Sequence, residues 1–109
     1  MDGARGGVDR VFAALGDAGR RSLVEAVAAR GTATATELAA ELPVTRQAVA
    51  KHLAVLQDAG LVDTSGPVRG RMYSFTPTPL TDAMTWIVDV GAGWDERLAR
   101  LKRQVERRA

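Results

Sequence analysis

The sequence predicts a mainly α-helical fold that carries a small β-hairpin and ends in one long helix. Three observations support this prediction. Apolar residues recur at helical spacing through most of the 109 residues. Two short segments rich in strand-forming residues flank a loop of glycine and proline at 66–70. Only two glycines interrupt the helical pattern that follows Pro79. The length is that of a single domain.

The composition excludes several classes of protein. The chain has no cysteine and one histidine, which excludes disulfide frameworks, thiol catalysis and metal sites rich in either residue. No apolar run approaches the ~18–20 residues of a membrane span, and the N-terminus lacks a signal-peptide core. We therefore expect a cytoplasmic protein that makes no membrane contact. The net charge of +2 is compatible with nucleic acid binding but does not establish it.

Two short helices are predicted after a glycine-rich start. Residues 1–7 contain three glycines and are expected to form a disordered tail. Gly16 should end the first helix, and Asp17 should cap a second helix that runs to Arg30, where Gly31 ends it. The first helix is predicted from apolar residues at i, i+3, i+4 and i+7, which are Val8, Val11, Phe12 and Leu15.

A capping box predicts the start of the third helix. Thr34 stands at the N-cap position and Glu37 three residues later, so that a helix is expected from about residue 35 to 42. Pro43 breaks it. The preceding pair Thr32-Ala33 is too short to predict more than a loop or a one-residue strand.

The fourth helix follows after a tight turn. Thr45 caps it, Gly60 terminates it after Ala59, and its core face is predicted to carry Val49, Leu53 and Leu56. Leu38 and Leu42 of the third helix should face the same core.

A hairpin and a long helix complete the chain. Residues 61–65 and 71–75 are predicted strands, and Thr78 and Pro79 should open the last helix as cap and first residue. This order of elements is that of a winged helix-turn-helix. After the tail of residues 1–7, we divide the chain into a DNA-binding part, residues 8–78, and a C-terminal dimerisation helix of the same domain, residues 79–109.

The exposed face of the fourth helix is the first candidate site. With Val49 taken as the core direction, Gln47 and Lys51 point away from the core, and Arg46 and Ala50 lie on the flank. Such side chains bind base edges and phosphates in a major groove, although the same residues could form a solvated face.

Three further positions are candidates for DNA contact. His52 is expected either to contact a phosphate or to form a buried shoulder of the core. Arg69 and Arg71 flank the hairpin tip and could reach the minor groove, although Arg71 could instead pair with a carboxylate. The candidate DNA-binding residues are Thr45, Arg46, Gln47, Ala50, Lys51, His52, Arg69 and Arg71.

Three stretches of the sequence resemble the ArsR/SmtB-type winged-helix repressors. They are VFAALGDAGRR at 11–21, AVAKHLAVLQDAGLV at 48–62 and GRMYSF at 70–75. The resemblance extends over about residues 8–108. It implies a homodimeric transcriptional regulator that binds double-stranded promoter DNA and represses its own gene. The chain has Ala50 where the family usually has a DNA-contacting serine, and Ala18 where proline is common.

The metal-sensing residues of that family are missing. Its founding members bind metals through cysteines on the helix before the recognition helix, or through histidines and carboxylates on the last helix. Here residues 36–42 contain no thiol and the last helix no histidine. Soft metals need thiolate or imidazole ligands, so we expect no metal site and no cofactor.

A heptad seam runs along the last helix. Eight apolar or small residues follow one another at spacings of four and three, which is typical of a helix that pairs with another helix. The seam could instead bury one side of a monomer, but a helix this long cannot be covered by the rest of the chain. We predict a C2 homodimer that binds an inverted repeat with half-sites about 10 base pairs apart. The seam consists of Leu80, Met84, Ile87, Gly91, Trp94, Leu98, Leu101 and Val105.

Two other functional interpretations remain open, and one is excluded. Ala50 and the modest net charge are compatible with a winged-helix protein-interaction module that has lost DNA binding. An unknown small-molecule effector could bind between the first and last helices, although apolar side chains such as these more often form dimer core. No catalytic triad, carboxylate pair or phosphate-binding glycine loop indicates an enzyme. The side chains of that effector cleft are Phe12, Met84, Trp86 and Trp94.

Overall fold

The computed structural model describes residues 2–108, and side chains from residue 7 onward. Met1 of the predicted tail and Ala109 of the predicted last helix lie outside the described residues. The elements in chain order are α1 (Asp2–Leu15), α2 (Ala18–Arg30), β1 (Thr32–Thr34), α3 (Ala35–Glu41), α4 (Arg46–Asp58), β2 (Val62–Ser65), β3 (Met72–Phe75) and α5 (Thr78–Arg108).

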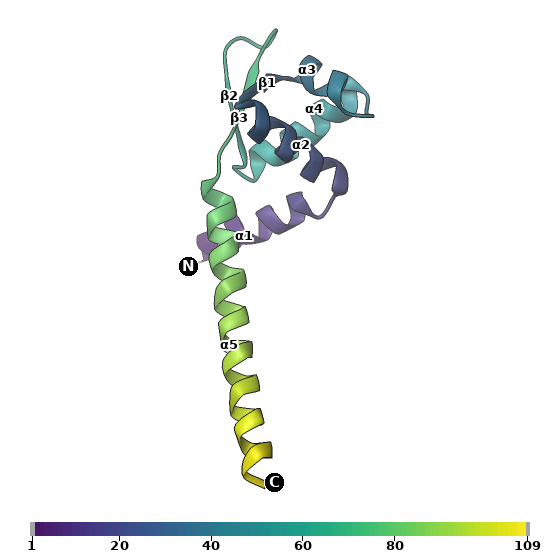
Figure 1. The fold of residues 1–109 in the computed structure, drawn as a ribbon. Coiled ribbons are helices and arrows are strands. Elements are labelled where there is room, and N and C mark those ends of the chain that lie inside the picture. Colours follow the sequence, from purple (N-terminus) through teal and green to yellow (C-terminus); the bar gives the residue numbers. More distant parts are fainter. Residues whose placement is uncertain (1, 109) are drawn as a thin grey trace.

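The molecule has a compact head and a long stem (Figure 1). Helices α2–α4 and the three strands form the head, and α1 lies across the start of α5 beneath it. The rest of α5 extends away from the head, so that the principal dimensions are 68 × 32 × 20 Å. Among the described residues, no helix is both long and apolar enough to cross a bilayer.

The core of the head is a single apolar cluster. Leu38, Val49, Leu53 and Leu56, all predicted to face the core, are fully buried. Leu42 is partly buried against them. The other large side chains that are fully buried are Val11, Leu23, Val27 and Leu61.

A three-stranded antiparallel sheet replaces the predicted two-stranded hairpin. Its order is β1-β3-β2, and Tyr73 in the central strand pairs with Ala33 on one side and Thr64 on the other. The expectation of a loop or one-residue strand at Thr32-Ala33 was therefore wrong. The strand forms because Ala33 is fully buried and its backbone pairs with a strand about forty residues later, which local propensity cannot reveal.

Three of the four predicted N-caps are confirmed. Asp17 Oδ2 accepts from the Arg20 N–H at 3.0 Å, and Thr45 Oγ1 accepts from the Ala48 N–H at 3.1 Å. The capping box is complete, because Thr34 Oγ1 accepts from the N–H three residues later while the carboxylate there accepts from the Thr34 N–H. These caps satisfy backbone donors that the first turn of a helix leaves free.

Two helix starts differ from the predictions. The helix α1 begins at Asp2, so residues 2–7, predicted as part of a disordered tail, are helical. Backbone hydrogen bonds can continue a helix beyond the apolar stripe from which its start was predicted. The helix α5 begins at Thr78, which was predicted to be its cap, because the Pro77 carbonyl already accepts from the Thr81 N–H at 3.1 Å.

Two arginines of α2 hold the end of α1. Arg20 Nε donates to the Ala14 carbonyl at 2.6 Å, and Arg21 Nη1 donates to the Leu15 carbonyl at 2.5 Å. The last carbonyls of a helix have no partner within it, so these bonds satisfy them and join the two helices.

We predict that Leu53→Ala lowers the free energy of unfolding by about 2–5 kcal/mol, because it leaves a cavity in the fully buried core. Val55→Ala on the same helix is the matched control, since Val55 is 40% exposed. Chemical denaturation at one protein concentration measures both. Equal losses for the two variants would contradict the assigned core face of α4.

Candidate nucleic-acid interface

The helices α3 and α4 form the helix-turn-helix. They pack through Leu38 and Val49, both fully buried, and the turn between them is closed by Val44, which is partly buried against the core. The Leu42 N–H donates to the Leu38 carbonyl and so finishes α3, and the Thr45 hydroxyl starts α4. This packing directs the opposite side of α4 to solvent.

The exposed side of α4 brings five predicted residues together. Thr45, Arg46, Gln47, Ala50 and Lys51 are all exposed within the first two turns. Three of them, Arg46, Gln47 and Ala50, line an open surface depression of about 470 Å³. The surface is long, polar and basic, with a small residue where another molecule can approach the helix backbone.

His52 does not lie on this face. Its side chain is only 24% exposed, and Nε2 is 4.0 Å from Asp17 Oδ2. It packs against the start of α2, where a Cβ added at Gly19 would come within 3.3 Å of Nε2. We expected His52 either to contact a phosphate or to pack at the edge of the core. Its position against α2 favours packing at the edge of the core. The sequence left both positions open because the rotation of α4 against α2 decides between them.

The carboxylate of Asp17 contacts both the backbone N–H of Arg20 and the imidazole of His52. The Arg20 N–H, which donates to its carboxylate, lowers the pKa of Asp17 below its ordinary 3.8, and the cationic side chain of Arg20 acts in the same direction. The carboxylate therefore caps α2 in its charged form and faces the imidazole of His52.

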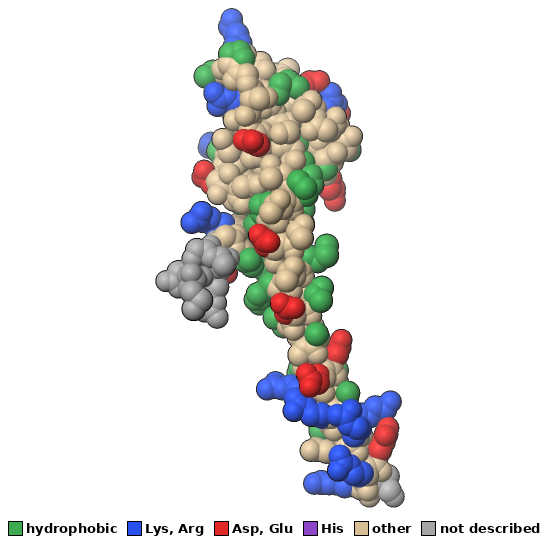
Figure 2. All heavy atoms as spheres, turned by 90° about the vertical axis from the view of Figure 1, so that its left-hand side faces the viewer, with side chains coloured by type: hydrophobic (Ala, Val, Ile, Leu, Met, Phe, Trp, Pro, Cys, Tyr) green, Lys and Arg blue, Asp and Glu red, His purple; other side chains and the backbone are tan. Residues whose placement is uncertain are grey.

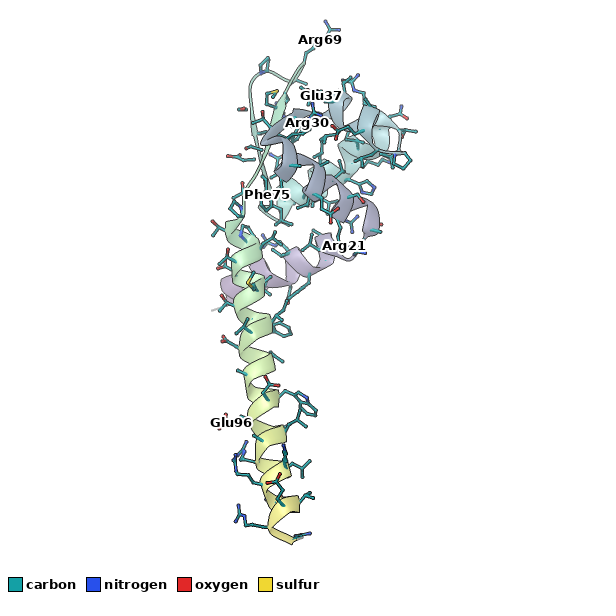
Figure 3. All side chains as sticks on the ribbon, in the orientation of Figure 1. Arg21, Arg30, Glu37, Arg69, Phe75 and Glu96 are labelled. Carbon is teal, nitrogen blue, oxygen red and sulfur yellow. The ribbon has the colours of Figure 1, made fainter. Side chains whose placement is uncertain are left out.

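Arg69 lies at the tip of the wing, the hairpin of β2 and β3 with its loop. Figure 3 shows it at the end of the head opposite the stem. Gly66 and Gly70 bound the loop at φ values of +86° and +77°, a conformation that only glycine adopts without strain. Val68 beside Arg69 is 84% exposed. The loop thus holds one basic and one apolar side chain fully in solvent.

Arg71 lies at the end of the wing loop, directly before β3 begins at Met72. It lines a cavity of about 230 Å³ that Arg46 and Ala50 of α4 also line. The ion pairs of the described residues involve Arg30 and His52, so the alternative pairing of Arg71 with a carboxylate is not present.

A charged cluster that the sequence did not predict positions α3. Arg30, at the end of α2, donates to Glu37 at 2.7 Å and also to Glu41 (Figure 3). The bond to Glu41, followed by the bond to Glu37, raises the pKa of Arg30. The i, i+4 spacing of the two glutamates was a possible signal, because it places both on one face of α3.

The stem carries an uncovered apolar surface. Leu80 and Ala83, at the start of α5 where α1 packs against it, are covered by the chain itself, but most of the predicted seam is not. Figure 2 shows hydrophobic side chains along the middle of α5, with basic side chains beyond them and at the wing end of the head. The exposed seam residues are Met84 (61%), Ile87 (53%), Trp94 (57%), Leu98 (44%), Leu101 (57%) and Val105 (62%); Gly91 is half-buried.

The predicted effector cleft is only partly assembled. The rings of Phe12 and Trp86 meet edge to face, with centroids 5.5 Å apart. Trp94 lies more than two turns further along α5 and lines a separate, open depression with Leu98. Within the described part of the chain, no group of three or more potential metal ligands lies together.

The chain is similar to proteins that regulate transcription. A family model described as a helix-turn-helix domain matches residues 10–65. YuzN of Bacillus subtilis, an uncharacterized HTH-type transcriptional regulator, is 39% identical over 89 residues, which is 75% of this chain and 97% of that protein. The HTH-type transcriptional regulator Rv2034 of Mycobacterium tuberculosis is 40% identical over 90 residues, 83% of this chain and 80% of that one.

Solved structures with a similar fold include other regulators. An ArsR-like transcriptional regulator from Rhodococcus sp. RHA1 superposes with a TM-score of 0.81 at 38% identity, over 93% of this chain and 94% of that one. Reduced HlyU from Vibrio cholerae superposes with a TM-score of 0.62 at 20% identity, over 78% of this chain and 86% of that one. This similarity is one of fold alone.

The contacts of Glu37 predict a dependence of stability on pH. Its bonds from the Thr34 N–H, the Thr34 hydroxyl and Arg30, in that order, lower the pKa of Glu37 below its ordinary 4.5. The charged form therefore stabilises the fold above about pH 4.5, and this contribution is lost as the pH falls through the lower folded pKa.

We predict that Glu37→Gln, which keeps a capping side chain without the charge, is less stable than the wild type at neutral pH. The difference should shrink as the pH falls below about 4.5. Chemical denaturation between pH 3 and 7 measures it, with Glu25→Gln as the control for loss of one acidic charge. A difference that stays constant down to pH 3 would contradict the role of the charged carboxylate.

Proposed function

Because the chain belongs to the ArsR family of winged helix-turn-helix transcriptional regulators, we propose that it is a repressor that binds an inverted-repeat operator as a homodimer. The family assigns a DNA-binding regulator of transcription, in a class of proteins that are not enzymes. The repressor role, the control of its own promoter and the operator are our proposal. Its place of action is the cytoplasm, at the nucleoid.

The exposed first two turns of α4 are the observation that carries this function. The major groove of B-DNA, ~12 Å wide, admits an α-helix. Gln47 and Lys51 are exposed on that side and can bond to base edges and phosphates, while Ala50 can touch a thymine methyl. The opposite side of the helix is buried in the core, so only this side is free for DNA.

The wing extends the DNA contact beyond the major groove. Arg69 is exposed at the tip of a loop held by two positive-φ glycines, which suits an arginine that enters the adjacent minor groove. Because most of the affinity would come from basic side chains at phosphates, binding should weaken steeply with salt.

The uncovered seam of α5 supports the homodimer. Six large apolar side chains of the seam remain 44–62% exposed in the single chain, and exposed apolar patches of this kind mark interaction sites. A two-fold axis at the stem would present two copies of α4 about one DNA turn apart, as an inverted repeat requires. An effector, if the regulator has one, acts without thiol ligands, since the chain has no cysteine.

We predict that Gln47→Ala combined with Lys51→Ala weakens binding to the upstream region of its own gene at least about tenfold, since each lost contact costs ~1–3 kcal/mol. Fluorescence anisotropy measures the affinity. The control is Lys102→Ala, which removes the same charge from the only other lysine, on α5. Unchanged binding by the double variant would exclude α4 as the recognition helix.

We predict that Leu98→Lys yields a monomer with at least about hundredfold weaker operator binding, because it places a charge in the seam and breaks the pairing of half-sites. The matched control is Ala99→Lys, one residue away and off the seam. Sedimentation equilibrium gives the mass of each variant. A Leu98→Lys protein that remains dimeric would show that the stem is not the dimer interface.

A further inference from the structure

A cavity beside the loop of the wing joins three elements of the DNA-binding head. Its volume is about 230 Å³. The wing contributes Arg71 and Tyr73, α4 contributes Arg46 and Ala50, and the start of α3 contributes Thr36. The remaining lining residues are Thr34, Ala35, Val68 and Gly70.

The cavity carries positive charge that nothing in the chain neutralises. Arg46 and Arg71 are the only charged residues among the described ones that line it. Neither takes part in an ion pair or a side-chain hydrogen bond within the described residues. The carboxylate of Glu37 in α3 is engaged by Arg30 and by the Thr34 N–H. Two guanidinium groups from different elements at one small cavity favour the binding of an anion.

The size and the lining favour a single phosphate group. Sites for small organic ligands usually occupy ~300–1,000 Å³, more than this cavity offers. Thr36 and Tyr73, which carry hydroxyl groups, are among the lining residues, and hydroxyls and guanidinium groups are the usual partners of phosphate oxygens.

We propose that Arg46 and Arg71 bind one and the same backbone phosphate of the operator, with Thr36 and Tyr73 as further ligands. The inference rests on the proposed DNA binding and deepens it. One phosphate held by both arginines sets the angle between α4 and the wing on DNA. It also supplies a polar contact beside Ala50, whose own side chain has no polar group.

The test uses operator duplexes in which each phosphate of a half-site is replaced in turn by a neutral methylphosphonate. The duplex comes from the upstream region of the gene, and fluorescence anisotropy measures binding by the full chain. At one position the wild type should lose about tenfold in affinity, as expected for a charged hydrogen-bonded contact. Arg46→Gln and Arg71→Gln should both bind the unmodified duplex more weakly and both lose sensitivity at that same position.

Arg69→Gln is the control, because it removes an arginine from the wing tip and should keep the sensitivity at that position. Thermal unfolding verifies that the variants fold like the wild type. If the two arginine variants lose sensitivity at different phosphates, or at none, the shared phosphate is excluded while DNA binding stands. A wild-type protein that binds no duplex overturns the proposed function and this inference with it.

A second measurement separates DNA phosphate from a free phosphate compound. Inorganic phosphate replaces chloride at equal ionic strength, and the melting temperature is followed without DNA. We expect no saturable shift that distinguishes the wild type from the Arg46→Gln and Arg71→Gln double variant. A saturable rise confined to the wild type would assign the cavity to a free phosphate ligand and overturn the proposal.

Discussion

The burial of the apolar side of α4 is the constraint on which the rest of the head depends. Leu53 and Leu56 of α4 lie entirely within the core, together with Leu38 of α3. Isolated helices of 13 and seven residues are at best marginal in water, so this packing is what keeps α4 and α3 helical. Once that side is buried, the opposite side of α4 has one orientation, and the basic and polar residues on it form a single surface.

The sheet fixes the position of the wing relative to the helices of the head. Because β3 pairs with β1 as well as β2, the hairpin is attached to the junction of α2 and α3 and not only to the end of α4. The cluster of Arg30 with Glu37 and Glu41 holds α3 from the other side. The wing and the helix-turn-helix therefore form one unit, in which Arg71 comes to lie at the same cavity as Arg46.

The stem differs from the head, because the rest of the chain covers only the first turns of α5. The helix has 31 residues, a length of about 46 Å, and α1 packs only against the part near Ala83 and Trp86. Beyond it the apolar stripe continues without cover. In the proposed homodimer, a second copy that buries this stripe would also set the distance between the two copies of α4, so that the proposed dimerisation and the recognition of a two-fold operator would depend on the same helix.

The sequence by itself determined the caps, the helix-turn-helix, the turn of the wing and the seam of α5. These features depend on residues three or four positions apart, or on periodicity along one element, and Asp17 or Thr45 can be recognised from its neighbours alone. Only the tertiary structure decided that Ala33 joins the sheet, that His52 turns toward α2, and that Arg71 and Arg46 line the same cavity. Each of these depends on strand register or on the rotation of one packed helix against another, which is set by contacts between residues far apart in the chain.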